Sequence, residues 1–111
     1  MTNYNINHER CRPFSDTCGN ALLAASTALT YTVPGADSVT YRAEFSVSSS
    51  ADVWVRKNGT AAVPTSNTMA TTTYQERIDT NTMLFVQGGD TLSFISTGTP
   101  QVGVSLLRLP G

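Results

Sequence analysis

The sequence predicts an all-β protein: a jelly-roll-like antiparallel β-sandwich preceded by an extended N-terminal arm. Apolar and polar residues alternate with a period of two in several short segments. Turn residues separate these segments every 8–12 residues, and no window of helical period is long enough to stand alone. Since the 111 residues suit one domain, we expect an arm over residues 1–20 and a single β-sandwich domain over residues 21–111.

The clearest predicted strand covers residues 38–48. Its apolar residues Val39, Tyr41, Ala43, Phe45 and Val47 share one face, and polar residues share the other. One buried face and one solvated face are typical of an antiparallel sheet. A shorter alternating segment at 28–33 ends at Pro34-Gly35, a turn dipeptide.

The middle of the chain predicts a hairpin and a Thr-rich strand. Residues 52–57 alternate and end at Asn58-Gly59, which favours a tight hairpin turn. Residues 61–67 contain Pro64, which indicates an edge strand or a loop. We expect a further strand at 69–78 with an exposed Thr-rich face, followed by a turn at 79–81.

Three more strands are predicted towards the C-terminus. Residues 82–87 are apolar on both faces, residues 91–96 alternate, and residues 101–109 place alternate apolar side chains on one face. Turns at 88–90 and 98–100 separate them. The residues expected in the core are Tyr41, Phe45, Val53, Val55, Phe85, Leu92 and Phe94.

Residues 1–20 differ in composition from the rest of the chain. They are polar, lack any strand or helix period, and carry four charges and the single His. Tyr4, Ile6 and Phe14 are apolar residues for which a solvated tail has little use. We therefore expect an arm that docks on a partner, the alternative being a frayed tail.

Composition excludes several classes of function. The net charge is −1 and the seven cationic residues form no stripe, which argues against nucleic-acid binding. No apolar run is long enough to span a membrane. The start of the chain, MTNYNINHERCR, has no apolar core, so we expect no secretory signal there.

No residue pattern predicts catalysis, a metal or another cofactor. His8 has no partner pattern for a nucleophilic triad, and the scattered carboxylates show no pairing towards one cleft. His8, Cys11 and Cys18 are too few for a zinc site. The two cysteines are expected as free thiols, with a disulfide as the alternative left open by the spacing.

The low charge of the surface suggests assembly. Charged residues make up 14% of the chain, whereas Thr and Ser together number 28. So neutral a monomer tends to associate, and we expect much of the surface to be covered in an assembly, a hydroxyl-wetted monomer being the alternative. Trp54 lies out of phase with Val53 and Val55, so it faces a partner or belongs to a strand buried on both faces.

Three segments carry a family resemblance: the hairpin VWVRKNGT at 53–60, the strand entry GGDTLSF at 88–94 and the final strand VGVSLL at 102–107. With its length, arm and composition, the chain resembles the capsid decoration (staple or cement) proteins of tailed phages. The resemblance implies a homodimer on the outer capsid surface that bridges subunits of the major capsid protein, made in the host cytoplasm and without a catalytic site. Contact residues are predicted at Tyr4, Ile6, Arg10, Arg12, Phe14, Trp54 and Arg56.

A second interpretation comes from another class. The same hairpin and final strand are similar to trimeric jelly-roll heads, which phage tail fibres use to bind host receptors or glycans. That interpretation predicts exposed aromatic side chains such as Trp54 or Tyr74 at a pocket or tip. For either function we expect no nucleic acid, no membrane and no cofactor as partners.

Overall fold

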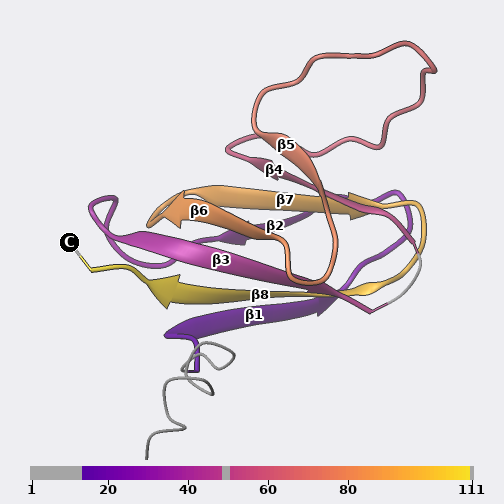
Figure 1. The fold of residues 1–111 in the computed structure, drawn as a ribbon. Helices are drawn as coiled ribbons and strands as arrows, with labels where there is room; N and C mark the ends of the chain where they lie inside the picture. The colour runs from indigo at the N-terminus through magenta and orange to yellow at the C-terminus, as the bar shows by residue number, and fades with distance from the viewer. Residues whose placement is uncertain (1–13, 49–50, 111) are drawn as a thin grey trace, which may run out of the picture.

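The computed structural model describes residues 14–48 and 51–110, and these form two antiparallel sheets of four strands each (Figure 1). Sheet A has the order β1-β8-β3-β6 and sheet B the order β2-β7-β4-β5. Their bounds are β1 Thr17–Leu22, β2 Leu29–Thr32, β3 Thr40–Val47, β4 Val53–Lys57, β5 Gln75–Ile78, β6 Met83–Gln87, β7 Thr91–Ser96 and β8 Gln101–Arg108. The all-β prediction is therefore confirmed, with the two sheets stacked as a sandwich.

The connections alternate between the two sheets. The chain changes sheet at each link from β1 to β8 except the one between β4 and β5, which are neighbours in sheet B. Strands adjacent in a sheet are thus mostly distant in sequence, as in the pairing of β1 with β8. In the described residues no helix has the length and apolar character needed to span a bilayer.

The core lies between the sheets, where the inward side chains of both meet. Phe45 of β3 and Phe94 of β7 are each 2% exposed, and their rings make an edge contact with centroids 6.0 Å apart. Such a contact adds about 1 kcal/mol beyond the burial of its area. The expected core residues Tyr41, Phe45, Val53, Val55, Leu92 and Phe94 are confirmed as buried.

Phe85 is a correction to that list, because its side chain is 70% exposed. In the pairing of β6 with β3, Leu84 lies opposite Ala43 and Val86 opposite Tyr41, so these two side chains point inward. Alternation then directs Phe85 to the outer face of sheet A. A strand that is apolar on both faces does not reveal which face is buried.

The region after β4 also departs from the sequence prediction. Asn58 does take a left-handed backbone conformation, with φ 59°, but it opens a long loop over residues 58–74 rather than a two-residue hairpin turn. The strand expected at 69–78 is limited to β5, Gln75–Ile78. Tyr74 has φ 61°, which lies outside the extended region, so the ladder cannot continue through it.

The first strand begins within the segment assigned to the arm, residues 1–20. Residues 17–20 belong to β1, which pairs with β8 from Thr17↔Leu106 to Leu22↔Gln101. The Asp16 amide extends this ladder by donating to the Leu106 carbonyl at 2.9 Å. The remaining predicted strands, at 28–33, 38–48, 52–57, 82–87, 91–96 and 101–109, are confirmed to within a few residues.

Gly88 is required by a close approach of two backbone segments. A Cβ there would lie 2.1 Å from the Ala36 carbonyl oxygen and 2.6 Å from that of Gly35. We expect Gly88→Ala to lower the free energy of unfolding by about 1–3 kcal/mol, because backbone must move to admit the methyl group. Urea denaturation measures this loss.

Gly19→Ala is the matched control for this prediction. A Cβ at Gly19 would meet the edge of the Tyr31 ring at 3.2 Å, and a side chain can shift where backbone cannot. Equal losses in the two variants would contradict the argument.

Candidate interaction surface

The long loop, residues 58–74, extends well away from both sheets (Figure 1). No charged residue occurs from Asn58 to Gln75. Loops of this length without secondary structure are usually functional when they are ordered. Its composition therefore suits contact with another uncharged surface.

Backbone and side-chain hydrogen bonds close the base of the long loop. The Lys57 amide donates to the Tyr74 carbonyl at 3.0 Å. The side-chain oxygen of Gln75 accepts a hydrogen bond from the Ala62 amide at 3.2 Å, and the side-chain nitrogen of Gln75 donates to the Ala62 carbonyl at 3.0 Å. The Ala61 amide donates to the buried Ser93 hydroxyl at 2.9 Å, which holds this segment on the outer face of sheet B. The long loop thus projects from a base that is held closed by hydrogen bonds, here called the loop neck.

A second anchor joins the start of the long loop to the turn between β6 and β7. The Asn58 side chain accepts from the Thr91 amide at 2.9 Å and donates to Asp90 at 3.2 Å. The other oxygen of Asp90 accepts the Gln87 amide at 2.9 Å. These contacts connect the loop to the start of β7 and, through Asp90, to the end of the edge strand β6.

Exposed large apolar side chains gather on the side of the sandwich where β5 and β6 form the edges, here called the open side. Four of the seven exposed large hydrophobic residues found in the described part of the chain lie on β6 or the long loop: Met69, Tyr74, Met83 and Phe85, which are 94%, 64%, 56% and 70% exposed. Tyr74 and Phe85 line the same cleft, and Met83 shares the outer face of β6 with Phe85. Contiguous apolar surface of this kind marks an interaction site more often than a freely solvated surface.

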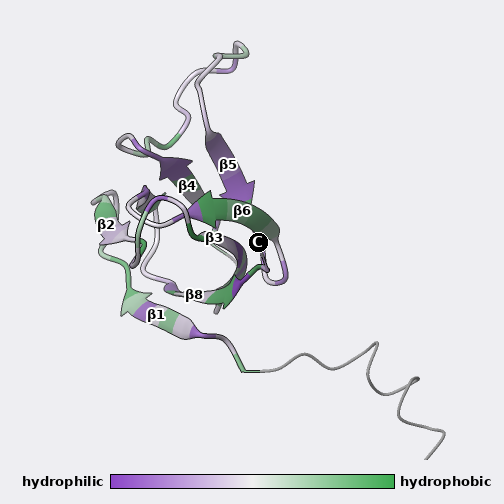
Figure 2. Cartoon of the chain, turned by 90° about the vertical axis from the view of Figure 1, so that its left-hand side faces the viewer, coloured by the Kyte–Doolittle hydropathy of each residue, from purple (hydrophilic) through white to green (hydrophobic). Residues whose placement is uncertain are grey.

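The two edge strands of the open side differ in character, as the hydropathy colouring in Figure 2 shows. β5 is hydrophilic and carries Glu76 and Arg77, whereas β6 is almost wholly hydrophobic. Arg77 forms ion pairs with Asp52 at 3.4 Å and Asp79 at 4.0 Å. β5 therefore has the charges that discourage pairing with another strand, and β6 lacks them.

Between β5 and β6 the core opens into a cleft of about 300 Å³. Phe45, Val55 and Leu84 reach it from the interior. At its rim the Lys57 ammonium lies 4.6 Å from the centroid of the Tyr74 ring, a cation–π contact that holds the exposed tyrosine in place.

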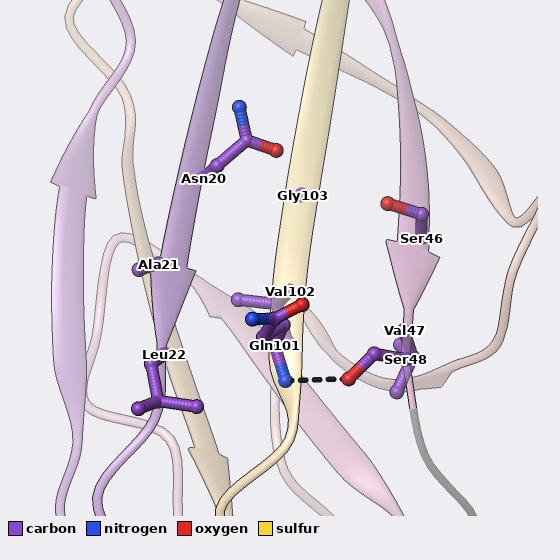
Figure 3. Close-up of a pocket in the computed structure, with 9 residues that line it drawn as sticks. All are labelled: Asn20, Ala21, Leu22, Ser46, Val47, Ser48, Gln101, Val102 and Gly103. Atoms are coloured by element: carbon purple, nitrogen blue, oxygen red, sulfur yellow. Dashed lines mark hydrogen bonds between the residues drawn. The ribbon is translucent and has the colours of Figure 1, made fainter.

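A polar hollow of about 440 Å³ lies on the outer face of sheet A (Figure 3). Gly103 forms its floor, and a Cβ there would lie 2.7 Å from the Ser46 hydroxyl and 2.8 Å from the side-chain oxygen Oδ1 of Asn20. Ser48 closes one end by accepting the Gln101 amide at 2.8 Å. The hollow offers hydroxyl and amide groups for hydrogen bonding but no nucleophile with a base.

The predicted contact residues do not converge in one place. Phe14 is 98% exposed beside β1, on sheet A. Trp54 is half-buried on the outer face of sheet B opposite Ile95, which resolves its orientation in favour of the outward one. Arg56 donates to the Thr60 carbonyl at 3.4 Å at the loop base. Tyr4, Ile6, Arg10 and Arg12 lie outside the described residues.

Residues 14–48 and 51–110 contain no cluster of three His, Cys, Asp or Glu side chains that could hold a metal ion. Cys18 is a free, exposed thiol on β1. His8 and Cys11 lie outside the described residues. Met69 and Met83 are exposed apolar residues that the predicted contact residues do not include, although the uncharged stretch from 58 to 75 and the strand that is apolar on both faces are signals in the sequence.

Comparison with protein-family models, with curated proteins and with solved structures finds no match to this chain.

Gln75 provides a test of the loop neck. We expect Gln75→Ala to cost about 1–2 kcal/mol, because both hydrogen bonds to Ala62 are lost. Limited proteolysis should cut faster within 63–74, while the sandwich resists. Glu76→Ala, an exposed neighbour on β5, should leave the cutting rate unchanged. An unchanged cleavage rate in Gln75→Ala would show that this side chain does not hold the loop neck closed.

The protonation of Tyr31 makes the stability of the fold depend on pH in the alkaline range. Burial raises the pKa of Tyr31 above its ordinary value of 10.0, and negative charge on Cys18 and then Tyr41 raises it further. Because the unfolded chain loses this proton first, stability falls as the pH rises above about 10. Tyr31→Phe should show a shallower alkaline decline of the melting temperature. Parallel declines for the two proteins would contradict this assignment.

Proposed function

We propose that this protein is a structural virion component that binds the outer surface of a viral capsid. In this role it bridges neighbouring subunits of the major capsid protein and stabilises the shell against the pressure of packaged DNA. The observation that carries the proposal is the open side, where an uncharged projecting loop and exposed apolar side chains occur on a sandwich of low charge. The family resemblance of the strand entry at 88–94 and of the final strand at 102–107 supports the same function.

The strand order supports the finer fold assignment made here, a jelly roll. Strands 1, 8, 3 and 6 face strands 2, 7, 4 and 5, and the chain crosses repeatedly between the sheets. Eight strands wound in this way form the double-sheet jelly roll found in capsid proteins and lectins. The fold itself does not specify the function, which depends on the surface it presents.

The chemistry of the surface suits repeated weak contacts. Apolar and hydroxyl-bearing side chains make contacts that salt screens little, in contrast to exposed ion pairs. On a lattice, many identical sites near one another raise the effective concentration, so modest individual affinities are sufficient. A second copy of the chain is an expected partner, because closed two-fold symmetry is the commonest arrangement of identical subunits.

A receptor-binding head of a tail fibre or spike is the second candidate. Tyr74 favours it, since this aromatic is 64% exposed at the rim of the cleft, as a ligand-binding tip requires. The two functions differ in the number of copies that a particle needs.

The copy number in purified virions tests the proposal. We expect a ratio near one chain per major capsid protein, because a decoration protein occupies the whole lattice. Quantitative mass spectrometry against the capsid protein measures the ratio. A few copies per particle would favour the receptor-binding head, and absence from particles would overturn both functions.

A further inference from the structure

The strand β6 presents an unpaired backbone edge to solvent. Two hydrogen bonds flank the pairing of β3 with β6. The Gly88 amide donates to the carbonyl of Val39, just before β3, and the Phe45 amide donates to the carbonyl of Thr82, just before β6. Thr40 instead accepts from Leu109, on the β8 side. This alternation means that Tyr41 and Ala43 bond to their partners on β6, Val86 and Leu84. The backbone groups of Met83 and Phe85 therefore point to the free edge.

The sequence of this edge has none of the features that prevent another strand from pairing with it. MLFVQ contains no charge, proline or glycine, and its register with β3 is continuous over five residues. Natural edges are usually protected by a charge, a proline or a bulge. The other edge of the open side, β5, carries Glu76 and Arg77 on four residues. β6 is thus the edge of the open side that accepts an added strand.

The exposed side chains of β6 lie beside this edge on the outer face of sheet A. Phe85 is 70% exposed and Met83 is 56% exposed. A strand added to the edge would cover both side chains as well as bond their backbone groups. The edge thus combines main-chain donors and acceptors with apolar surface, the combination used in β-strand addition.

We propose that β6 of one copy pairs antiparallel with β6 of a second copy, about a two-fold axis at Phe85, and joins the two A sheets into one of eight strands. This inference rests on the proposed function as a self-associating structural protein and names its contact. In that register the outward backbone groups of Phe85 meet those of the partner's Phe85, and Leu84 lies opposite the partner's Val86.

The charge pattern favours a second copy as the occupant of the edge. Two-fold pairing about Phe85 places this residue against its own copy, so a charge there would face a like charge. β6 has no charge, its apolar residues at 84, 85 and 86 meet apolar residues, and only Met83 lies opposite a polar residue, Gln87. The surface area buried by backbone pairing alone is smaller than the roughly 1,200 Å² that a stable interface buries. The long loop, which projects on the same side, supplies further contact surface (Figures 1 and 2).

The test is the association state of the full chain in solution, by analytical ultracentrifugation at about 1–100 µM. We expect a dimer. Met83→Lys with Phe85→Lys should weaken it at least about tenfold, because edge lysines block strand pairing. Leu22→Lys is the matched control: Leu22 is also an exposed apolar residue on the outer face of sheet A, but at its opposite edge, and this variant should remain dimeric.

Amide hydrogen exchange at Phe85 distinguishes strand pairing from side-chain contact alone. Protection of this amide should rise with protein concentration in the wild type. If the double lysine variant does not fold, Phe85→Thr, which keeps strand propensity and removes the ring, takes its place. A monomeric wild type, a dimer unaffected by these variants, or a dimer without protection at Phe85 would each overturn the proposal. Because no capsid is present, these outcomes are separate from the copy number in virions.

Discussion

The packing of two half-apolar sheets against each other is the constraint on which the rest of this structure depends. Neither sheet can bury its inner face alone, and the Phe45–Phe94 contact lies where the central strands β3 and β7 meet. Both rings are almost completely buried. Once these faces are matched, every other side chain of the strands is assigned to the interior or the outside by alternation.

The long loop depends on this packing through a small number of polar ties. Ser93 is buried on the outer face of sheet B and holds Ala61, while Asn58 and Asp90 join the loop to the turn before β7. The buried Ser93 hydroxyl is satisfied by the Ala61 amide, which offsets the cost of removing it from water. A loop anchored at its base in this way presents its uncharged tip without disturbing the core.

The distribution of charge and apolar surface is the basis on which we propose association as the function of the chain. The described residues contain no metal-binding cluster. β5 carries Glu76 and Arg77, and Arg77 pairs with Asp52 just before β4, whereas β6 and the long loop have no charge. The open side therefore has one edge strand with charges that oppose strand pairing, β5, and one edge strand without such charges, β6. In the dimer that we propose, pairing takes place at the edge without charges, and the loop is left to contact other surfaces.

The sequence by itself determined where most strands run, because alternation with period two and the turns at Pro34-Gly35, 79–81 and 88–90 are local properties. It did not determine that Asn58 opens a long loop, because the same dipeptide serves a tight turn and the bonds from Ser93 and Gln75 come from distant strands. Nor did it place Phe85 outside, since β6 is apolar on both faces and only its register against Ala43 and Tyr41 chooses between them. Which strands are edges follows from pairings such as β1 with β8, between the two ends of the domain. The candidate surface was therefore decided by tertiary structure, because an edge exists only once all other pairings are made.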